Sequence, residues 1–245
     1  MPHQPSISYA IVAALETANP HKKAQSTRNL VASWRADHYT ELGRTPPPDR
    51  PARPTKPPLL PPRGVPRRRI TAGSAGRIAL LHAIAHIELN AIDLALDMAS
   101  RFVGKNLPKA FYNDWLGVAD DESRHFLMLS DRLTQLGAAY GDLPAHDGLW
   151  QAAHATKHDL LARLAIAPLV LEARGLDVTP AMIEKLTNVG DPDSAAALNI
   201  IMTDEVGHVA VGKRWFDYVC GLERLDPVSS WHRLVTQYFH GDLKP

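Results

Sequence analysis

Two short stretches of this chain each place a glutamate and a histidine three positions apart within an otherwise apolar segment. One is "MTDEVGHVAVG", which contains Glu205 and His208, and the other is "DDESRHF", which contains Glu122 and His125. On a helix of about 3.6 residues per turn, residues three positions apart project from the same face. A carboxylate buried on such a face is costly, so it must be neutralised, paired or bound to a metal.

The helix faces that carry these pairs are apolar, which indicates that both turn toward a core. The face of Glu205 and His208 also holds Leu198, Ile201, Met202, Val209 and Gly212. The face of Glu122 and His125 also holds Trp115, Val118, Ala119, Phe126, Leu129 and Leu133. A single Glu-x-x-His pair is commonly a surface or helix-pairing motif, but two pairs in separate helices favour a shared role.

Two further glutamates lie on comparable apolar faces: Glu88 in "LLHAIAHIELNAIDLAL" and Glu172 in "LLARLAIAPLVLEARG". The separation from Glu88 to Glu122 is 34 residues, and that from Glu172 to Glu205 is 33 residues. This repetition predicts two related helix pairs that pack with approximate two-fold symmetry.

Four carboxylates and two histidines have the chemistry of a dinuclear metal site. Two divalent cations bring four positive charges, which four carboxylates cancel, so the cluster can lie in a core of low dielectric constant. Each neutral imidazole adds a nitrogen ligand and leaves coordination positions open for water or oxygen. This donor set resembles that of di-iron and di-manganese carboxylate bundles, which implies two iron ions, with manganese or a mixed pair as the alternative, at Glu88, Glu122, His125, Glu172, Glu205 and His208.

Other histidines lack this support. His154 and His158 have a spacing seen in zinc-binding helices, but 14 residues, or roughly 21 Å of helix, separate His158 from Glu172. His82 and His86 lie on the side of their helix away from Glu88. His154 and His158 are expected to be surface or structural residues, and ordinary packing or hydrogen bonding is expected for His82 and His86.

Each Glu-x-x-His pair is preceded by an aspartate, Asp121 in one case and Asp204 in the other. Ligating histidines usually donate their second ring nitrogen to an oxygen, which is one role for these aspartates. A charge on the helix surface is the other interpretation.

The elements that must position these residues are helices. The periodicity predicts helices over 73–103, 108–136 and 148–174, then a short helix to 188 capped by Thr179 and begun by Pro180. A last long helix, to about 220, should follow Asp191 and Pro192. Four long helices with mostly short connections predict an all-α protein built as a four-helix bundle.

The N-terminal part differs in composition. Residues 8–38 are expected to be helical with a break at Asn19-Pro20, whereas 46–66 holds ten of the 20 prolines and favours an extended linker or surface strap. Seven positive charges between Arg50 and Arg69 fit a solvated spacer or, alternatively, a contact with RNA or another acidic partner. We divide the chain into 1–45, a linker 46–70, the bundle 71–220 and a C-terminal extension 221–245.

The composition of the chain limits its expected binding partners and cellular compartment. The 245 residues are 45% hydrophobic with a net charge of +1, so no global basicity argues for nucleic acid or membrane binding. The single cysteine, Cys220, excludes an internal disulfide and a zinc site of several thiolates, and it fits a reducing compartment. We expect a cytoplasmic protein that does not cross a membrane.

The sequence resembles the ferritin-like superfamily and, more closely, the bacterial family catalogued as domain of unknown function 455. The resemblance rests on "PPRGVPRRR", "LLHAIAHIELNAIDLALD", "FYNDWLGVADDESRHF", "GDLPAHDGLW", "LEARGLDVTP" and "DEVGHVAVGKRWF". It implies a ferritin-like bundle in which one Glu from each of two helices and a Glu-x-x-His from each of the other two bind the metals. The functional relatives that it suggests are oxygen-dependent di-iron enzymes, including tRNA-modifying hydroxylases.

The leading hypothesis is therefore an oxygen-activating oxidoreductase with a dinuclear metal site. Its partners would be dioxygen and a small-molecule or RNA substrate, and copies of the chain could form a small homo-oligomer. One alternative is a ferroxidase that stores iron, although the extra N-terminal helices and proline-rich segment are hard to accommodate in a closed shell. The other alternative is a non-catalytic metal-binding helical protein.

Overall fold

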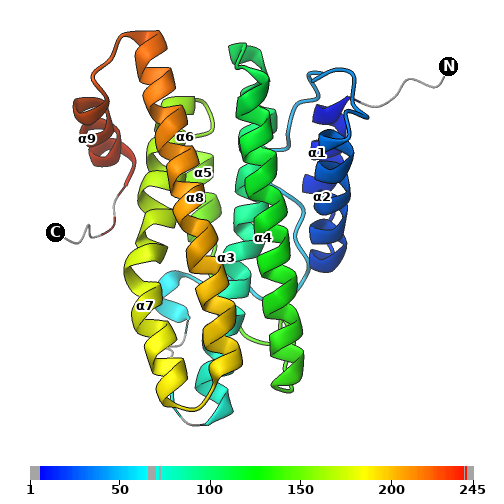
Figure 1. Cartoon of the computed structure of the whole chain (residues 1–245), viewed down its shortest axis with the longest axis vertical. Helices are drawn as coiled ribbons and strands as arrows, with labels where there is room; N and C mark the ends of the chain where they lie inside the picture. The colour runs from blue at the N-terminus through cyan, green and yellow to red at the C-terminus, as the bar shows by residue number, and fades with distance from the viewer. Residues whose placement is uncertain (1–5, 66–69, 72, 240, 242–245) are drawn as a thin grey trace.

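The protein is all-α in the computed structural model, which describes residues 6–65, 70–71, 73–239 and 241. Four long columns of helix run side by side and form a bundle (Figure 1). Three columns are α3 (Ser74–Arg101), α4 (Lys109–Gln135) and α8 (Pro192–Glu223). The fourth is formed by consecutive segments, α6 (Leu160–Ile166), η3 (Ala167–Glu172) and α7 (Ala173–Asn188). The first two predicted bundle helices and the last one are confirmed to within a few residues.

Two N-terminal helices, α1 (Ile7–Leu15) and α2 (Pro20–Arg35), cover one side of the bundle, against α3 and α4 (Figure 1). The predicted break between them is confirmed, because the Asn19 side chain caps α2 by accepting from the Lys22 N–H at 2.9 Å. Pro20 then occupies the first turn, where its missing N–H costs nothing. The buried side chains of both helices join the main hydrophobic core.

The proline-rich segment is a strap that lies against the bundle. The Ala52 N–H donates to Leu15 O at 2.9 Å, and the Leu60 N–H donates to Ala145 O at 2.8 Å. Two arginines of the strap form ion pairs with the rest of the protein, Arg50 with Asp147 and Arg53 with Asp93. A short 3-10 helix, η1 (Pro62–Gly64), ends the described part of the strap. Arg67, Arg68 and Arg69 lie outside the described residues.

The single helix predicted over 148–174 is wrong, because the chain folds there as several segments. The first, α5 (Gly148–Ala155), ends in a turn, and α6 starts anew where the Asp159 carboxylate accepts from the N–H groups of Leu161 and Ala162. η3 then has π-helical geometry, in which the Ala173 N–H bonds Pro168 O, five residues back. Pro168 lacks an N–H, so it cannot continue the regular ladder.

The separate helix predicted to begin at Pro180 is also wrong. α7 runs without interruption from Ala173 to Asn188, and Pro180 lies inside it. The Thr179 hydroxyl does not cap a new helix but donates to Gly175 O at 2.8 Å, one turn back. Packing of α7 along α8 therefore overrides the local preference of proline to end a helix.

Short connections complete the bundle. The 3-10 helix η2 (Val103–Lys105) joins α3 to α4. At the start of α8 the predicted signal is confirmed, since the Asp191 carboxylate accepts from the Ser194 N–H at 3.1 Å and Pro192 fills the first turn. The C-terminal helix α9 (Pro227–Tyr238) packs on the outside of α6 and α8 (Figure 1).

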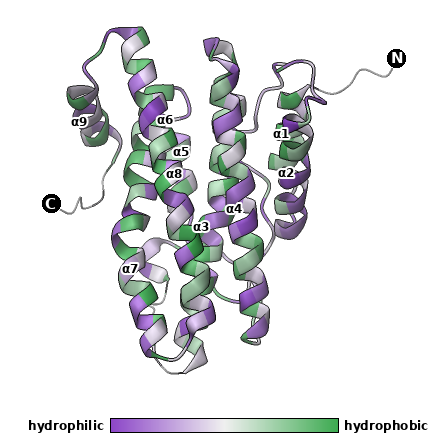
Figure 2. Ribbon diagram, viewed as in Figure 1, coloured by the Kyte–Doolittle hydropathy of each residue, from purple (hydrophilic) through white to green (hydrophobic). Residues whose placement is uncertain are grey.

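Helix α3 is long and apolar enough to cross a membrane, but 78% of its apolar window is buried within the protein. It also carries two fully buried aspartates, Asp93 paired with Lys23 and Asp97 paired with Arg163. Figure 2 shows hydrophobic and hydrophilic residues on every helix around it. These features identify α3 as a core helix of the bundle.

Helices α8 and η3 approach closely at Gly212. A side-chain carbon on Gly212 would lie 2.4 Å from Cβ of Pro168, so only glycine fits this crossing. Because the two segments run antiparallel, a step of one turn from Pro168 leads to Glu172, and a step of one turn back from Gly212 leads to His208. The contact between Gly212 and Pro168 therefore fixes the level along the bundle at which Glu172 and His208 lie opposite each other.

Candidate metal centre

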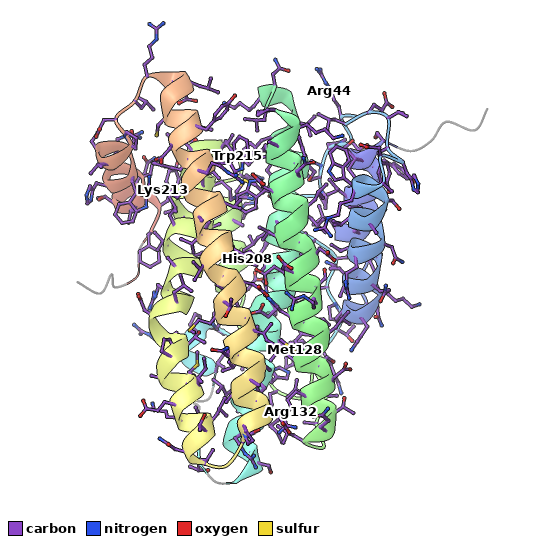
Figure 3. All side chains as sticks on the ribbon, viewed as in Figure 1. Arg44, Met128, Arg132, His208, Lys213 and Trp215 are labelled. Atoms are coloured by element: carbon purple, nitrogen blue, oxygen red, sulfur yellow. The ribbon has the colours of Figure 1, made fainter. Side chains whose placement is uncertain are left out.

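The residues singled out by the sequence meet in the middle of the bundle. Glu88 projects from α3, Glu122 and His125 from α4, Glu172 from η3, and Glu205 and His208 from α8. Figure 3 shows His208 near the middle of α8, on the side that faces α4. The four apolar faces predicted from periodicity are thus turned toward one another.

One group of potential ligands consists of Glu88, Glu122 and His125, whose ligand atoms all lie within 4.8 Å of one another. His125 Nδ1 is 3.0 Å from Glu88 Oε2 and 3.5 Å from Glu122 Oε2. All three side chains are buried, with at most 2% of each residue exposed. A carboxylate pair and one imidazole in this arrangement can hold a metal ion.

A second group consists of Glu122, Glu205 and His208, again with ligand atoms within 4.8 Å. His208 Nδ1 lies 3.1 Å from Glu122 Oε1 and 3.5 Å from Glu205 Oε2. Glu122 therefore belongs to both groups and presents one carboxylate oxygen to each histidine. A carboxylate shared in this way is suited to bridge two adjacent cations.

Glu172 stands apart from both three-residue groups. Its carboxylate is nevertheless close enough to Glu205 and Glu122 for their negative charges to add to the effect of burial, which together raise the pKa of Glu172 to about 8. Its Oε2 atom is buried and has no hydrogen-bond partner among the described residues. Glu172 thus faces the same cluster from the fourth helical column.

Unpartnered polar atoms concentrate at this centre. Among the described residues, the buried side-chain atoms without a hydrogen-bond partner include both oxygens of Glu122, Oε2 of Glu172, Oε2 of Glu205 and Nδ1 of His208. Buried polar atoms are nearly always satisfied, and each unsatisfied one costs about 1–3 kcal/mol. Their convergence fits a site whose remaining partners are cations.

The aspartate that precedes each Glu-x-x-His pair contacts the histidine of the other pair, on the other helix. Asp204 on α8 lies 2.9 Å from Nε2 of His125 on α4, and Asp121 on α4 lies 3.4 Å from Nε2 of His208 on α8. Each ring therefore points its Nδ1 atom at the carboxylates. Of the two interpretations of Asp121 and Asp204, the structure favours partners of the histidines over charges on the helix surface.

Arg124 is a residue of this network that the sequence did not single out. Its Nη2 atom lies 2.5 Å from Asp204 and 3.3 Å from Asp121, so one guanidinium links both aspartates. The only signal in the sequence is its position directly before His125.

The carboxylates around each of the two histidines favour its protonated form. Burial would lower the pKa of His125, but the carboxylates of Glu122 and Glu88 outweigh it and raise the pKa to about 11. Burial would also lower the pKa of His208, yet Asp121, Glu122 and Glu205 raise it well above its usual value.

The glutamates divide into two kinds. Burial and the charge of Glu122 raise the pKa of Glu88 well above its usual range, and the same two causes raise the pKa of Glu205. Burial acts in the same direction on Glu122, but the two imidazoles outweigh it and hold the pKa of Glu122 below its usual range. The raised pKa values of Glu88 and Glu205 thus favour bound protons at the centre, which a bound cation would displace.

The other four histidines are surface or hydrogen-bonded structural residues, as expected. His82 accepts from the Gly141 N–H at 2.9 Å, and His86 lies 2.8 Å from the Tyr140 hydroxyl. His154 and His158 are exposed, and His158 Nε2 lies 3.2 Å from the Tyr238 hydroxyl. These four residues lie outside both potential ligand groups.

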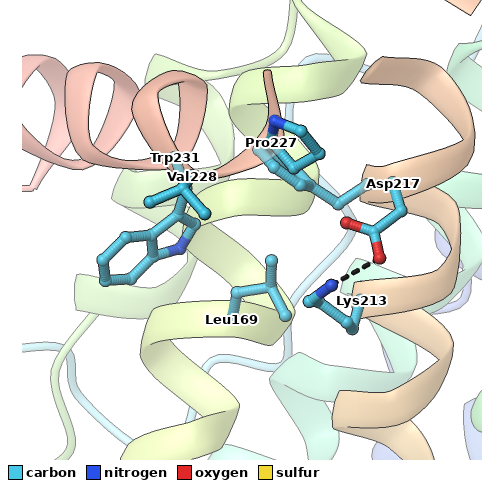
Figure 4. A pocket seen from close by; sticks show the side chains of 7 residues that line it. Leu169, Lys213, Asp217, Pro227, Val228 and Trp231 are labelled. Atoms are coloured by element: carbon cyan, nitrogen blue, oxygen red, sulfur yellow. Dashed lines mark hydrogen bonds and ion pairs between the residues drawn. The ribbon is translucent and has the colours of Figure 1, made fainter. Parts of the chain in front are cut away.

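A cavity of about 290 Å³ lies under α9, away from these ligands (Figure 4). Leu169, Val228 and Trp231 give it an apolar lining, and an ion pair between Lys213 and Asp217 closes one side. It lacks the carboxylate and imidazole ligands of the centre.

Comparison with known proteins places the chain in a family. Residues 16–245 match the family described as protein of unknown function (DUF455). An uncharacterized protein of Haemophilus influenzae (strain ATCC 51907 / DSM 11121 / KW20 / Rd) is 41% identical over 238 residues, which cover 92% of this chain and 81% of that protein. No solved structure matches the chain significantly. The match over nearly the whole bundle, strap and C-terminal helix shows that this protein belongs to the DUF455 family.

Proposed function

We propose that this protein is a ferritin-like dinuclear metal protein that activates dioxygen to oxidise an organic substrate. The observation that carries the proposal is the shared carboxylate of Glu122, which faces His125 with one oxygen and His208 with the other. Four glutamates, two imidazoles and several unsatisfied buried atoms are the donor set for two divalent cations. Bound iron would supply electrons to dioxygen, which is chemistry that amino-acid side chains lack.

The chain's own residues have defined tasks in this proposal. Glu88 and His125 would hold one metal ion, Glu205 and His208 the other, and Glu122 would bridge them. Glu172, which has no hydrogen-bond partner on Oε2 among the described residues, would complete the charge balance. Asp204 and Asp121 fix the imidazoles, so that the nitrogen ligands need not reorganise when metal binds.

An organic small molecule is the substrate class that we favour over RNA. Arg50 and Arg53, two cations of the basic segment, are paired with Asp147 and Asp93 and are not free to bind phosphate. Iron storage is disfavoured because α1, α2 and α9 cover outer sides of the bundle that copies in a closed shell would have to share. We propose a cytoplasmic location, in keeping with the single buried thiol, Cys220.

The test is the reaction of the iron-loaded, reduced protein with dioxygen. Metal-free protein would be loaded with ferrous iron under anaerobic conditions and mixed with oxygenated buffer in a stopped-flow spectrometer, with oxygen uptake followed in parallel. We expect uptake of about one dioxygen per pair of irons and a transient absorbance, as for a dinuclear oxidase. Glu122→Ala should abolish both signals, whereas His154→Ala should leave them unchanged.

Two other outcomes would contradict the proposal. Continued oxidation of hundreds of added ferrous ions into a large particle would identify iron storage. A protein that binds iron at the centre but does not react with dioxygen would be a metal-binding protein without this activity.

A further inference from the structure

A groove of about 380 Å³ lies between α4 and α8, directly outside the candidate metal centre. Its walls include Gly117 and Asp121 from α4 and Asp204 and Gly207 from α8, and His208 forms its floor. His208 is only 3% exposed, so it separates the groove from the ligand atoms behind it. The groove is thus an opening of the bundle surface that ends at a potential ligand.

The two Asp-Glu-x-x-His motifs differ at the position before the histidine, and this difference leaves the groove open beside His208. The residue before His125 is Arg124, whose guanidinium pairs with both Asp204 and Asp121. The residue before His208 is Gly207, which adds no side chain to the groove that it lines. A side-chain carbon on Gly207 would meet no atom within 4 Å in the described part of the chain. The motif on α4 thus places an arginine against both aspartates, whereas the motif on α8 leaves the space at Gly207, next to His208, unfilled.

His208 is also held less closely by its aspartate than His125 is. His208 Nε2 is 3.4 Å from Asp121, whereas His125 Nε2 is 2.9 Å from Asp204. The Asp121 side chain is 42% exposed, compared with 29% for Asp204. Behind His208, its Nδ1 atom has no hydrogen-bond partner among the residues described and lies 3.1 Å from Glu122 Oε1. A small movement of this ring would connect the groove to the bridging carboxylate.

The lining of the groove offers oxygen atoms to a cation. Asp114, Asp121 and Asp204 place three carboxylates along it, and Asn113 and Thr203 add neutral polar groups. Arg214 pairs with Asp114, and Arg124 pairs with Asp121 and Asp204, so each carboxylate has a cationic partner at the margin of the groove. Carboxylate and carbonyl oxygens are ligand types that divalent cations accept, so the groove can pass a hydrated cation to His208.

We propose that divalent cations reach the metal centre through this groove, past Asp121 and His208, and that Gly207 keeps the route open. The inference rests on the proposed function insofar as it requires that the carboxylate cluster binds metal. It assigns to the groove a role in metal loading, separate from the residues that hold the metal once bound.

The test compares metal loading of full-length variants, with Co²⁺ as a probe that binds without reacting with oxygen. Gly207→Leu places an uncharged, non-ligating side chain in the groove, and Gly117→Leu narrows it from the opposite wall. Gly221→Leu is the matched control, since Gly221 is also an exposed glycine of α8 whose side-chain carbon would meet no described atom within 4 Å. Stopped-flow absorbance would measure Co²⁺ uptake, and transfer to excess EDTA would measure release.

We expect Gly207→Leu to slow uptake and release alike by about tenfold or more, which is within the range by which access and steering alter association rates. Equilibrium occupancy should stay at the wild-type level, because blocking a route changes rates and not affinity. Gly117→Leu should slow both steps in the same direction, and Gly221→Leu should load at the wild-type rate.

The outcomes distinguish this inference from the proposed function. Wild-type protein that takes up no Co²⁺ at the centre would overturn the metal function itself. Wild-type protein that binds Co²⁺, with both Gly207→Leu and Gly117→Leu loading as fast, would overturn the route alone. Lower equilibrium occupancy in Gly207→Leu, with unchanged loading of Gly117→Leu, would also overturn it, since the substitution would then act on the site.

Discussion

His125 on α4 is held by Asp204 on α8, whose Oδ2 atom lies 2.9 Å from Nε2 of the ring. The opposite nitrogen, Nδ1, is thereby directed at Glu88 Oε2, 3.0 Å away. Arg124 in turn holds Asp204 at 2.5 Å. A ligand nitrogen in one helix is therefore oriented by a carboxylate in another, which couples the geometry of the metal centre to the packing of α4 on α8.

Removal of this orienting carboxylate should weaken metal binding without removing a ligand. We expect Asp204→Ala to lower affinity by roughly 10- to 100-fold, because the imidazole loses the partner that fixes it. Asp121→Ala should have a smaller effect, since its contact with His208 is longer, at 3.4 Å. Asp131, an exposed aspartate of α4, provides the control. Titration with Mn²⁺ would measure the affinities, and equal values for Asp204→Ala and Asp131→Ala would contradict the assigned role.

Metal stoichiometry should depend on which glutamate is removed. Glu122 belongs to both ligand groups, so Glu122→Ala should lose both ions. Glu88→Ala should weaken chiefly the ion at His125, and Glu205→Ala chiefly the ion at His208. Elemental analysis after reconstitution would count the ions, with His154→Ala and His158→Ala as controls that keep two. Retention of two ions by Glu122→Ala would show that its carboxylate is not shared.

Metal binding should release protons and strengthen as the pH rises. In the metal-free protein Glu172, with a pKa of about 8, and His125, with a pKa of about 11, both carry a proton at pH 7. A cation must displace these protons, so affinity should rise by about tenfold per pH unit for each proton displaced. The contribution of Glu172 should level off above pH 8.

Calorimetry in buffers of different ionisation enthalpy would count the released protons. The Glu172→Gln variant should release fewer protons near neutral pH, because its amide does not titrate. An affinity that stays constant from pH 6 to 8 would show that neither group is protonated in the metal-free state.

The stability of the close contact between α8 and η3 should depend on the absence of a side chain at Gly212. Gly212→Val would place its side chain against Pro168, where even Cβ would be 2.4 Å away. We expect a loss of about 1–3 kcal/mol in the free energy of unfolding, from overpacking. Metal affinity should also fall, because the strain separates Glu172 from Glu205.

Urea denaturation of the metal-free protein would measure the change in stability. Gly221→Val is the matched substitution in the same helix, at a position where a side-chain carbon meets no described atom within 4 Å. It controls for the helix propensity of valine. Similar stability of the two variants would show that α8 and η3 can separate without cost.

Much of the bundle follows from the sequence alone. The apolar faces around Glu88, Glu122 and Glu205 specify helices that turn these carboxylates inward, because helical periodicity is a local property. Asn19 and Asp191 likewise specify helix starts, since a cap needs only the next few residues of the chain. The candidate ligands could be chosen from these patterns and from the repeated spacing of the two halves.

Other features depend on residues that are distant in the chain. The packing of α7 along α8 overrides the preference of Pro180 to end a helix. The apolar pattern of the sequence continues from α5 to η3 without a break, so it did not reveal that the helix is interrupted there. The expected symmetry of the two motifs is also incomplete, because Arg124 pairs with both aspartates, whereas Gly207 at the matching position on α8 has no side chain.

The sequence by itself therefore determined the all-α bundle and the chemical identity of the candidate ligands, because both are set by residue type and local period. Only the tertiary structure decided that Glu122 serves both groups, that Glu172 stands apart, and that each aspartate holds the histidine of the other helix. Those relationships join residues as far apart as Asp121 and His208, 87 positions along the chain. Their distances depend on how closely the helices pack, which local periodicity does not encode.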